Sequence, residues 1–121
     1  MIDHTEVAVR DVGRSKAFYR AALAPLGYVA IVEGEQYADF GVPPKADFWI
    51  GEGTPNVPPV NVAFRAENRR QVDAFYRAAI AAGGRDNGPP GLRPHYHANY
   101  YGAFVLDPDG HNIEAVCHSA E

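Results

Sequence analysis

The chain has 121 residues, of which 46% are hydrophobic and 21% charged, a composition typical of a compact globular protein and not of a disordered or fibrous one. Its formal net charge of −4 at pH 7 provides no basic surface for nucleic acid or for an anionic membrane. The only cysteine, Cys117, excludes an intrachain disulfide and a thiolate zinc site, so we expect a reducing, cytoplasmic setting. No apolar run is long enough to span a bilayer.

The first half of the chain predicts the order βαβββ. Residues 3–11 alternate between apolar and polar side chains, which is typical of a half-buried strand. Residues 15–28 carry apolar side chains at helical spacing and offer Gly27 as a stop. Three short strand candidates follow, separated by glycine and proline, over residues 28–32, 36–40 and 46–50.

The second half repeats the first. Residues 72–85 match residues 15–28 at 8 of 14 positions, at an offset of 57 residues, and this self-similarity predicts two copies of one structural module. The same offset pairs the first strand with a second strand near residues 60–68. An irregular loop is predicted over residues 86–99. A hairpin over residues 100–118 then turns on Asp-Pro-Asp-Gly, a sequence that suits a type I turn.

We therefore predict an α+β fold of two tandem βαβββ modules within one domain, with module one over residues 1–51, a connector over 52–59 and module two over 60–121. Helices should cover the outer, apolar faces of two curved sheets, and the polar faces should line a cleft. The apolar set predicted under the helices comprises Thr5, Val7, Val9, Val62 and Phe64. By the same alternation, Cys117 belongs to the core and is expected to be inert.

Strand alternation places His4, Asp47 and Glu114 on the cleft side of three strands, with Trp49 beside them. Imidazole and carboxylate groups suit a divalent ion, which could polarise a bound oxygen atom. An equally simple interpretation is that these are half-exposed strand residues and that Asp47 only caps a turn. Trp49 is either a stacking surface for a ligand or a filler.

A second group of functional side chains lies in the loop before the last hairpin. It comprises Arg93, His95, Tyr96, His97, Tyr100 and Tyr101, and such loops commonly bind ligands. His97 or Tyr101 could assist proton transfer, with Glu114 acting on the substrate. Alternatively, the tyrosines line a subunit interface and the histidines are ordinary polar loop residues.

Two segments carry a family resemblance: HTEVAVRDVGRSKAFY from His4 and DPDGHNIE from Asp107 to Glu114. With these motifs, nearly the whole chain resembles the vicinal oxygen chelate superfamily, which includes glyoxalase I, bleomycin-resistance proteins, fosfomycin-resistance enzymes and extradiol dioxygenases. The resemblance implies metal ligands from the first and last strands of each module, at His4, Asn61 and Glu114, with Asp47 as the available fourth. The sequence departs from this pattern at Asn61, where a histidine is expected, and an amide oxygen is a poor ligand for zinc or iron.

The resemblance implies a glyoxalase-like lyase or isomerase, with Mg²⁺, Mn²⁺, Ni²⁺ or Zn²⁺ in a depleted site. The alternative is a metal-free binding protein of the bleomycin-resistance type, which would enclose an aromatic or amphipathic ligand with Trp49 and the tyrosine-rich loop. Asn61 would then contact the ligand. Relatives of this length commonly form homodimers, so a homodimer is expected, and a vestigial cleft with a functional dimer surface is a third possibility.

Overall fold

The computed structural model describes residues 1–121 and contains eight strands, two α-helices and one 3₁₀ turn. Module one comprises β1 (Thr5–Val9), α1 (Val12–Leu23), the 3₁₀ turn (Ala24–Leu26), β2 (Val29–Glu33), β3 (Tyr37–Gly41) and β4 (Phe48–Glu52). Module two comprises β5 (Asn61–Arg65), α2 (Arg69–Ala81), β6 (Arg85–Leu92), β7 (Tyr101–Leu106) and β8 (Asn112–Cys117). The repeated βαβββ order is thus confirmed. Neither helix has the length and apolarity needed to cross a membrane.

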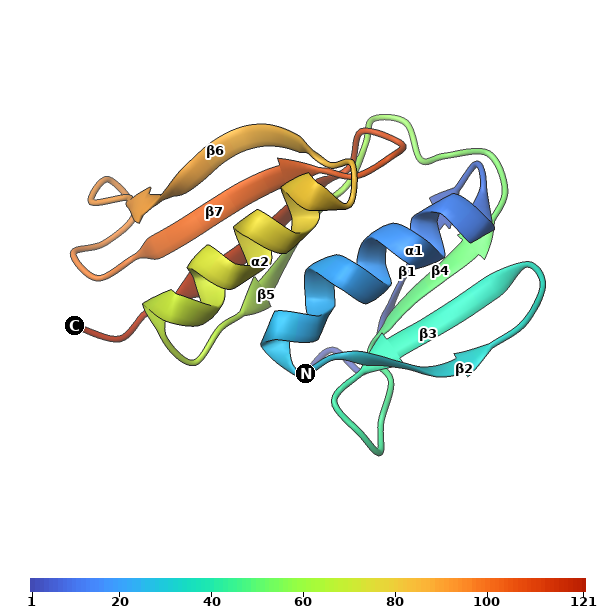
Figure 1. Ribbon diagram of the computed structural model, residues 1–121, viewed down its shortest axis with the longest axis horizontal. Helices are drawn as coiled ribbons and strands as arrows, with labels where there is room; N and C mark the ends of the chain where they lie inside the picture. The colour runs from blue at the N-terminus through green and yellow to red at the C-terminus, as the bar shows by residue number, and fades with distance from the viewer.

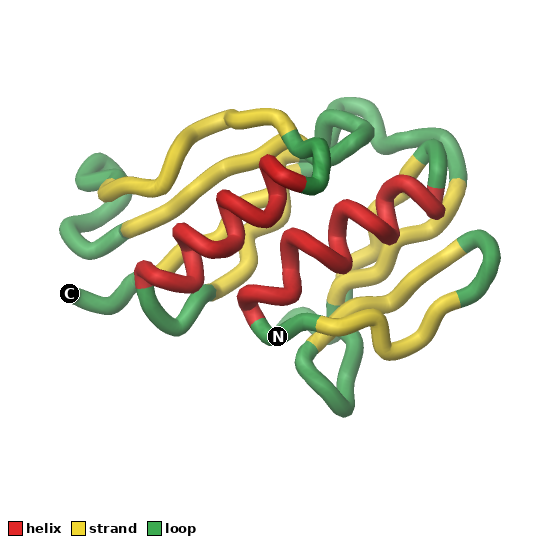
Figure 2. The backbone as a smooth tube through the Cα atoms, in the orientation of Figure 1, coloured by secondary structure: helices red, strands yellow, loops and turns green.

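The two modules have the same strand topology. Their sheets follow the orders β1-β4-β3-β2 and β5-β8-β7-β6, so the first strand of each module pairs in parallel with its last strand. The helices lie side by side in one layer in front of the two sheets and run in opposite directions (Figure 1). Figure 2 shows the same two-layer arrangement, with the connector between β4 and β5 at the top of the view.

The core lies between the helices and the sheets. Phe18, Leu23, Phe75 and Ala79 are fully buried on the helices, and their spacing explains why these two segments form amphipathic helices. Asp11 and Asn68 cap the first turns through bonds to Arg14 N–H and Gln71 N–H. At the end of the 3₁₀ turn, Gly27 adopts a left-handed conformation with a φ of 86°, as predicted.

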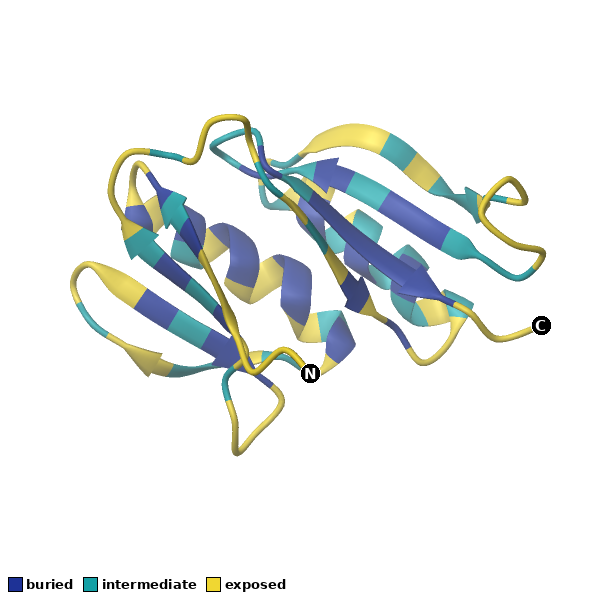
Figure 3. Ribbon diagram, turned by 180° about the vertical axis from the view of Figure 1, so that it is seen from behind, coloured by how far each residue is buried: buried dark blue, intermediate teal, exposed yellow.

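Figure 3 shows the opposite side of both sheets, where exposure differs strongly between strands. The start of β1 and much of β5 are exposed there, whereas β8 is buried almost throughout. Cys117 is in the core, as predicted. Thr5, which was predicted to pack under the helices, is exposed because it opens β1 at the edge of its sheet.

The irregular loop predicted over residues 86–99 was wrong for its first half, because Arg85–Leu92 forms β6. Its two glycines and two prolines interrupt the alternation of apolar and polar residues by which a strand is predicted. Prolines are tolerated there because β6 is an edge strand, and its pairing with β7 shifts register between Asp86 and Gly88 and again between Gly88 and Gly91.

The Asp-Pro-Asp-Gly turn joins the two modules. Gly110 N–H donates to the Asp107 carbonyl at 3.0 Å, which confirms the predicted turn. The carboxylate of Asp107 accepts a hydrogen bond from the hydroxyl of Tyr19 on α1. The buried imidazole of His111 accepts Val60 N–H at 3.0 Å and contacts the Ala8 carbonyl in β1 at 3.1 Å. Module two thereby supplies hydrogen-bond partners for the buried Tyr19 hydroxyl and the half-buried Ala8 carbonyl of module one.

Candidate functional site

On the first sheet, His4 and Trp49 form a stacked pair on the face away from the helices. Their ring centroids are 3.7 Å apart and the rings are nearly parallel, at 12°. Trp49 alternates with the buried Phe48 and Ile50 of β4, so it lies on the face that the sequence predicted for it. His4 Nδ1 lies 2.7 Å from a carboxylate oxygen of Asp3. The imidazole is therefore held between a carboxylate and an indole.

The strand registers identify the module-one counterpart of Glu114. Trp49 is opposite Glu6 in the β1–β4 pair, and Glu114 is opposite Ala63 in the β5–β8 pair. Glu6 and Ala63 are separated by the 57-residue offset of the repeat. The position equivalent to Glu114 is therefore Trp49 and not Asp47, which corrects the assignment made from sequence.

Asp47 has a different neighbour. It lies just before β4, and its carboxylate accepts the hydroxyl of Tyr28 at 3.1 Å. Tyr28 in turn packs edge-on against Phe64 of module two, with ring centroids 5.3 Å apart. Asp47 is thus directed toward the junction between the modules.

Asn61 belongs to a chain of amide side chains on the second sheet. The side-chain oxygen of Asn61 accepts a hydrogen bond from the side-chain NH₂ of Asn112. The side-chain oxygen of Asn112 in turn accepts a hydrogen bond from the NH₂ of Asn87 at 2.9 Å. Neither Asn87 nor Asn112 lies in a sequence pattern that marks it as a functional residue. Their positions on strands β6 and β8 became related to Asn61 only through the sheet order.

Glu114 is buried on β8 and accepts a hydrogen bond from the hydroxyl of Tyr100. Burial raises the pKa of the Glu114 carboxyl, against the opposing effects of the Tyr100 bond and the Arg93 charge. Burial, together with the Glu114 carboxylate, also raises the pKa of the Tyr100 hydroxyl. The pair is therefore a carboxyl that binds protons more readily than usual, beside a hydroxyl donor.

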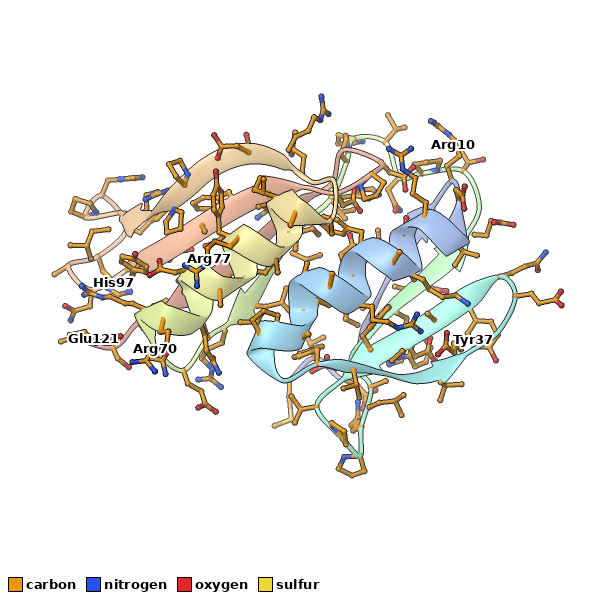
Figure 4. The ribbon with its side chains drawn as sticks, in the orientation of Figure 1. Arg10, Tyr37, Arg70, Arg77, His97 and Glu121 are labelled. Carbon is orange, nitrogen blue, oxygen red and sulfur yellow. The ribbon has the colours of Figure 1, made fainter.

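The loop before β7 gathers most of the aromatic residues predicted for it. Tyr96 and His97 pack against the ring of Tyr100, at centroid distances of 4.7 Å and 5.4 Å. His95 packs on Tyr96. His97 lies at the same end of the molecule as the C-terminal residue Glu121 (Figure 4), and its Nε2 is 2.7 Å from Nδ1 of His118.

Two further side chains of this region differ in orientation. The guanidinium of Arg93 lies 5.3 Å from the ring centre of Phe104, the residue opposite Glu114 in β7. Tyr101, however, points to the helix side, where its hydroxyl donates to Asp73 of α2 at 2.7 Å. Tyr101 therefore lies on the other side of the sheet from Tyr100, because side chains of consecutive residues alternate between faces.

The hollow of largest volume lies elsewhere, at the junction of the modules. A cavity of about 760 Å³ is lined by residues including Tyr28, Asp47, Arg65, Glu67 and His118. A smaller cavity of about 270 Å³ shares Tyr28, Asp47 and Arg65 with it, so the two form one groove. None of the hollows is lined by His4, Trp49, Tyr100 or Glu114.

Within a single chain, the side chains do not form a site for a divalent metal ion. No three histidine, cysteine, aspartate or glutamate side chains are grouped so that they could hold one, and the predicted set of His4, Asp47 and Glu114 is not assembled within the chain. At the two positions that depart from a ligand set, Trp49 has no oxygen or unprotonated nitrogen to offer, and the Asn61 oxygen already accepts a hydrogen bond.

Comparison with known proteins assigns this architecture. The model of the Glyoxalase/Bleomycin resistance protein/Dioxygenase superfamily matches residues 1–115. The chain belongs to this superfamily. Among solved structures, a glyoxalase/bleomycin resistance protein from Albidiferax ferrireducens T118 is 32% identical, with a TM-score of 0.79 over 98% of this chain and 99% of that one.

More distant members of the superfamily share the fold. A glyoxalase/bleomycin resistance protein/dioxygenase family enzyme from Burkholderia phytofirmans PsJN is 18% identical, with a TM-score of 0.75 over 97% of this chain and 98% of that one. A glyoxalase-related enzyme from Fulvimarina pelagi is also 18% identical, with a TM-score of 0.73 over 97% of this chain and 87% of that one. Comparison with the curated proteins gave no match.

Proposed function

We propose that this superfamily member binds a planar aromatic or amphipathic small molecule without a metal ion. The observation that carries the proposal is the His4–Trp49 stack, because Trp49 occupies the position equivalent to Glu114 and His4 packs on its ring. Aromatic rings are good ligand platforms because they bury large areas at little entropic cost. At this position the first sheet offers an aromatic ring where the second sheet offers a carboxylate.

The proposed binding surface has two parts. Trp49 supplies the aromatic part on the first sheet, and its indole N–H is buried without a hydrogen-bond partner. The second sheet supplies Tyr96 and Tyr100 as aromatic walls and Glu114 as a polar contact. Such a mixture of apolar walls and a few polar groups is typical of small-molecule sites.

We further propose that the protein is a cytoplasmic homodimer in which each site is completed by a second copy. In a single chain, no hollow includes Trp49 or Glu114. The polar face of the first sheet carries Glu6 and Asp39 on either side of Trp49, and the second sheet carries Arg93 beside Phe104. These opposite charges favour contact between the first sheet of one chain and the second sheet of its partner.

Two measurements test the binding proposal. Isothermal titration with Mn²⁺, Ni²⁺ and Zn²⁺ should give no stoichiometric binding. Titration with bleomycin and with a panel of planar aromatic compounds should identify at least one compound that binds saturably. Trp49→Ala should abolish that binding, whereas Trp49→Phe, which keeps a ring, should retain most of it. Stoichiometric metal binding that requires His4 and Glu114 would refute the proposal.

A second candidate function is metal-independent acid–base catalysis at Glu114. It is favoured by the raised pKa of the Glu114 carboxyl and by the adjacent Tyr100 hydroxyl. Glu114 would accept a proton from the substrate, and Tyr100 would donate a hydrogen bond to its oxygen. Mass spectrometry of a bound ligand after incubation distinguishes the two functions: an enzyme converts it, and Glu114→Gln stops conversion while leaving binding intact.

A further inference from the structure

The loop that carries Tyr100 is fastened to the end of β8 by two imidazole rings. Nε2 of His97 lies 2.7 Å from Nδ1 of His118, and the rings are stacked with centroids 4.9 Å apart at 26°. Within the loop, Arg93 N–H donates to the Tyr100 carbonyl at 2.7 Å and Tyr100 N–H donates to the His97 carbonyl at 3.2 Å. These local bonds fold the loop on itself, and the imidazole pair attaches it to the segment after β8.

The surrounding hydrogen bonds determine where the ring protons lie. The backbone N–H of Asn99 donates to Nδ1 of His97 at 3.1 Å, so this nitrogen carries no proton. In neutral His97 the proton is therefore on Nε2, from which it is donated to Nδ1 of His118. Nδ1 of His118 must then also be unprotonated. The observed arrangement requires both imidazoles to be neutral.

A proton on either ring disrupts this arrangement. If His118 gained a proton on Nδ1, two N–H donors would face each other between His118 and His97, and the hydrogen bond would be lost. If His97 gained a proton on Nδ1, that N–H would face the backbone N–H of Asn99 in the same way. Two protonated rings would also be stacked cations. One hydrogen bond of the arrangement is therefore lost when either ring gains a proton.

The charged groups around the pair are of both signs. Glu114 faces His118 from β8, and the loop contributes Arg93, His95 and the hydroxyls of Tyr96 and Tyr100. Across the groove that His118 lines are Arg65, Glu67 and Asp47. The carboxylates would attract a protonated His118 and the guanidiniums would oppose it, so no single charge fixes the pair in the neutral state.

We infer that His118 is a positioning residue that, together with His97, forms a pH-sensitive clasp on residues 93–100. Neutral rings hold the loop closed, which keeps Tyr100 on Glu114, and protonation releases it. The consequence for ligand binding rests on the proposed function, since the released loop would uncover the Glu114 part of the site. The clasp itself is independent of any ligand.

The test is residue-resolved amide hydrogen exchange by NMR at about pH 7.5 and about pH 5.5, expressed as protection factors so that the intrinsic pH dependence of exchange cancels. Exchange of the Arg93 and Tyr100 amides measures the opening of the loop, and exchange of the Ala103 and Ala115 amides measures the opening of the sheet. We expect loop protection in the unmodified protein to fall about tenfold at the lower pH, as expected when one proton must be lost for closure. Sheet protection should not change.

Three variants complete the test. His118→Ala should give low loop protection at both pH values. His118→Asn keeps an acceptor near the Nδ1 position but cannot titrate, so the loop should remain protected at both. His95→Asn, in the same loop but without an imidazole partner, should behave as the unmodified protein.

Equal loop protection at the two pH values in the unmodified protein, or undiminished protection in His118→Ala, would overturn the inference. If His118→Ala does not fold, the comparison of His118→Asn with His95→Asn still decides. Because no ligand is used, the result does not depend on the binding and metal titrations that test the proposed function.

Discussion

Replacing Tyr19 with phenylalanine removes one oxygen atom from the bond that joins α1 to the Asp107 turn of module two. The ring of Tyr19 is fully buried, and Asp107 is 3% exposed. The hydroxyl donates to one carboxylate oxygen, while the other carboxylate oxygen keeps its bonds from Asp109 N–H and His111 N–H, each at 2.9 Å. The substitution therefore removes one of three donors to a buried charge and leaves no cavity larger than an oxygen atom.

Hydrogen bonds to charged groups contribute about 1.5–3 kcal/mol, and a buried acceptor that loses a donor is not resolvated. We expect Tyr19→Phe to lower the free energy of unfolding by about 2 kcal/mol. Urea denaturation at pH 7 measures this loss, and the denaturant slope should be unchanged because the same surface is exposed on unfolding. Tyr101→Phe is the matched control: it removes a tyrosine–aspartate bond within module two, at a partly buried site, and should cost less than about 1 kcal/mol.

The reasoning would be refuted if Tyr19→Phe were no more destabilising than Tyr101→Phe. The bond between the modules would then contribute no more than a partly exposed bond within one module. A two-step urea transition confined to Tyr19→Phe would show instead that this bond alone couples the unfolding of the modules.

Three further predictions concern other buried or stacked groups. His111→Ala leaves the Ala8 carbonyl and Val60 N–H without the imidazole, so it should lower the free energy of unfolding by about 2–4 kcal/mol; a loss under about 1 kcal/mol in urea would contradict this. Burial raises the pKa of Glu114 above its ordinary 4.5, so the folded state retains this proton to higher pH than the unfolded state does. The Glu114 contribution to stability should therefore decline as pH rises from about 4.5 through the folded-state pKa, and this slope should be absent in Glu114→Gln; parallel urea-derived pH profiles would disprove it. His4→Ala uncovers the only tryptophan, Trp49, so acrylamide should quench its fluorescence more strongly, whereas Tyr101→Phe, which changes a side chain bonded to α2 on the helix side, should leave quenching unchanged.

Local patterns predicted the elements that carry strong periodicity. The helices repeat both an apolar stripe and several identical residues, so their existence and their relation were evident, although α1 begins at Val12 and α2 at Arg69, each three residues earlier than predicted. Strand β6 was missed because glycine and proline disrupt the alternation on which strand prediction depends. Its pairing with β7 is a non-local interaction that no local pattern records.

The candidate site depended more strongly on tertiary structure. Alternation correctly placed Trp49 and Glu114 on the faces away from the helices, but it could not show that they occupy equivalent positions, because this equivalence comes from the β1–β4 and β5–β8 registers. The sequence offers Asp47 as a fourth ligand because it is a carboxylate next to the last strand of module one. His118 did not stand out in the sequence, and its bond to His97 spans 21 residues.

The sequence by itself determined the duplicated βαβββ architecture and the substitution of Asn61 for the counterpart of His4, because both follow from residue identity and a constant offset along the chain. Only the tertiary structure determined that His4 stacks on Trp49, that Glu114 is bonded to Tyr100 and that His97 is bonded to His118. The physical reason is that a repeat is a property of the chain, whereas a site is set by distances between side chains from different strands and loops. Those distances are fixed by strand register and by the packing of the modules.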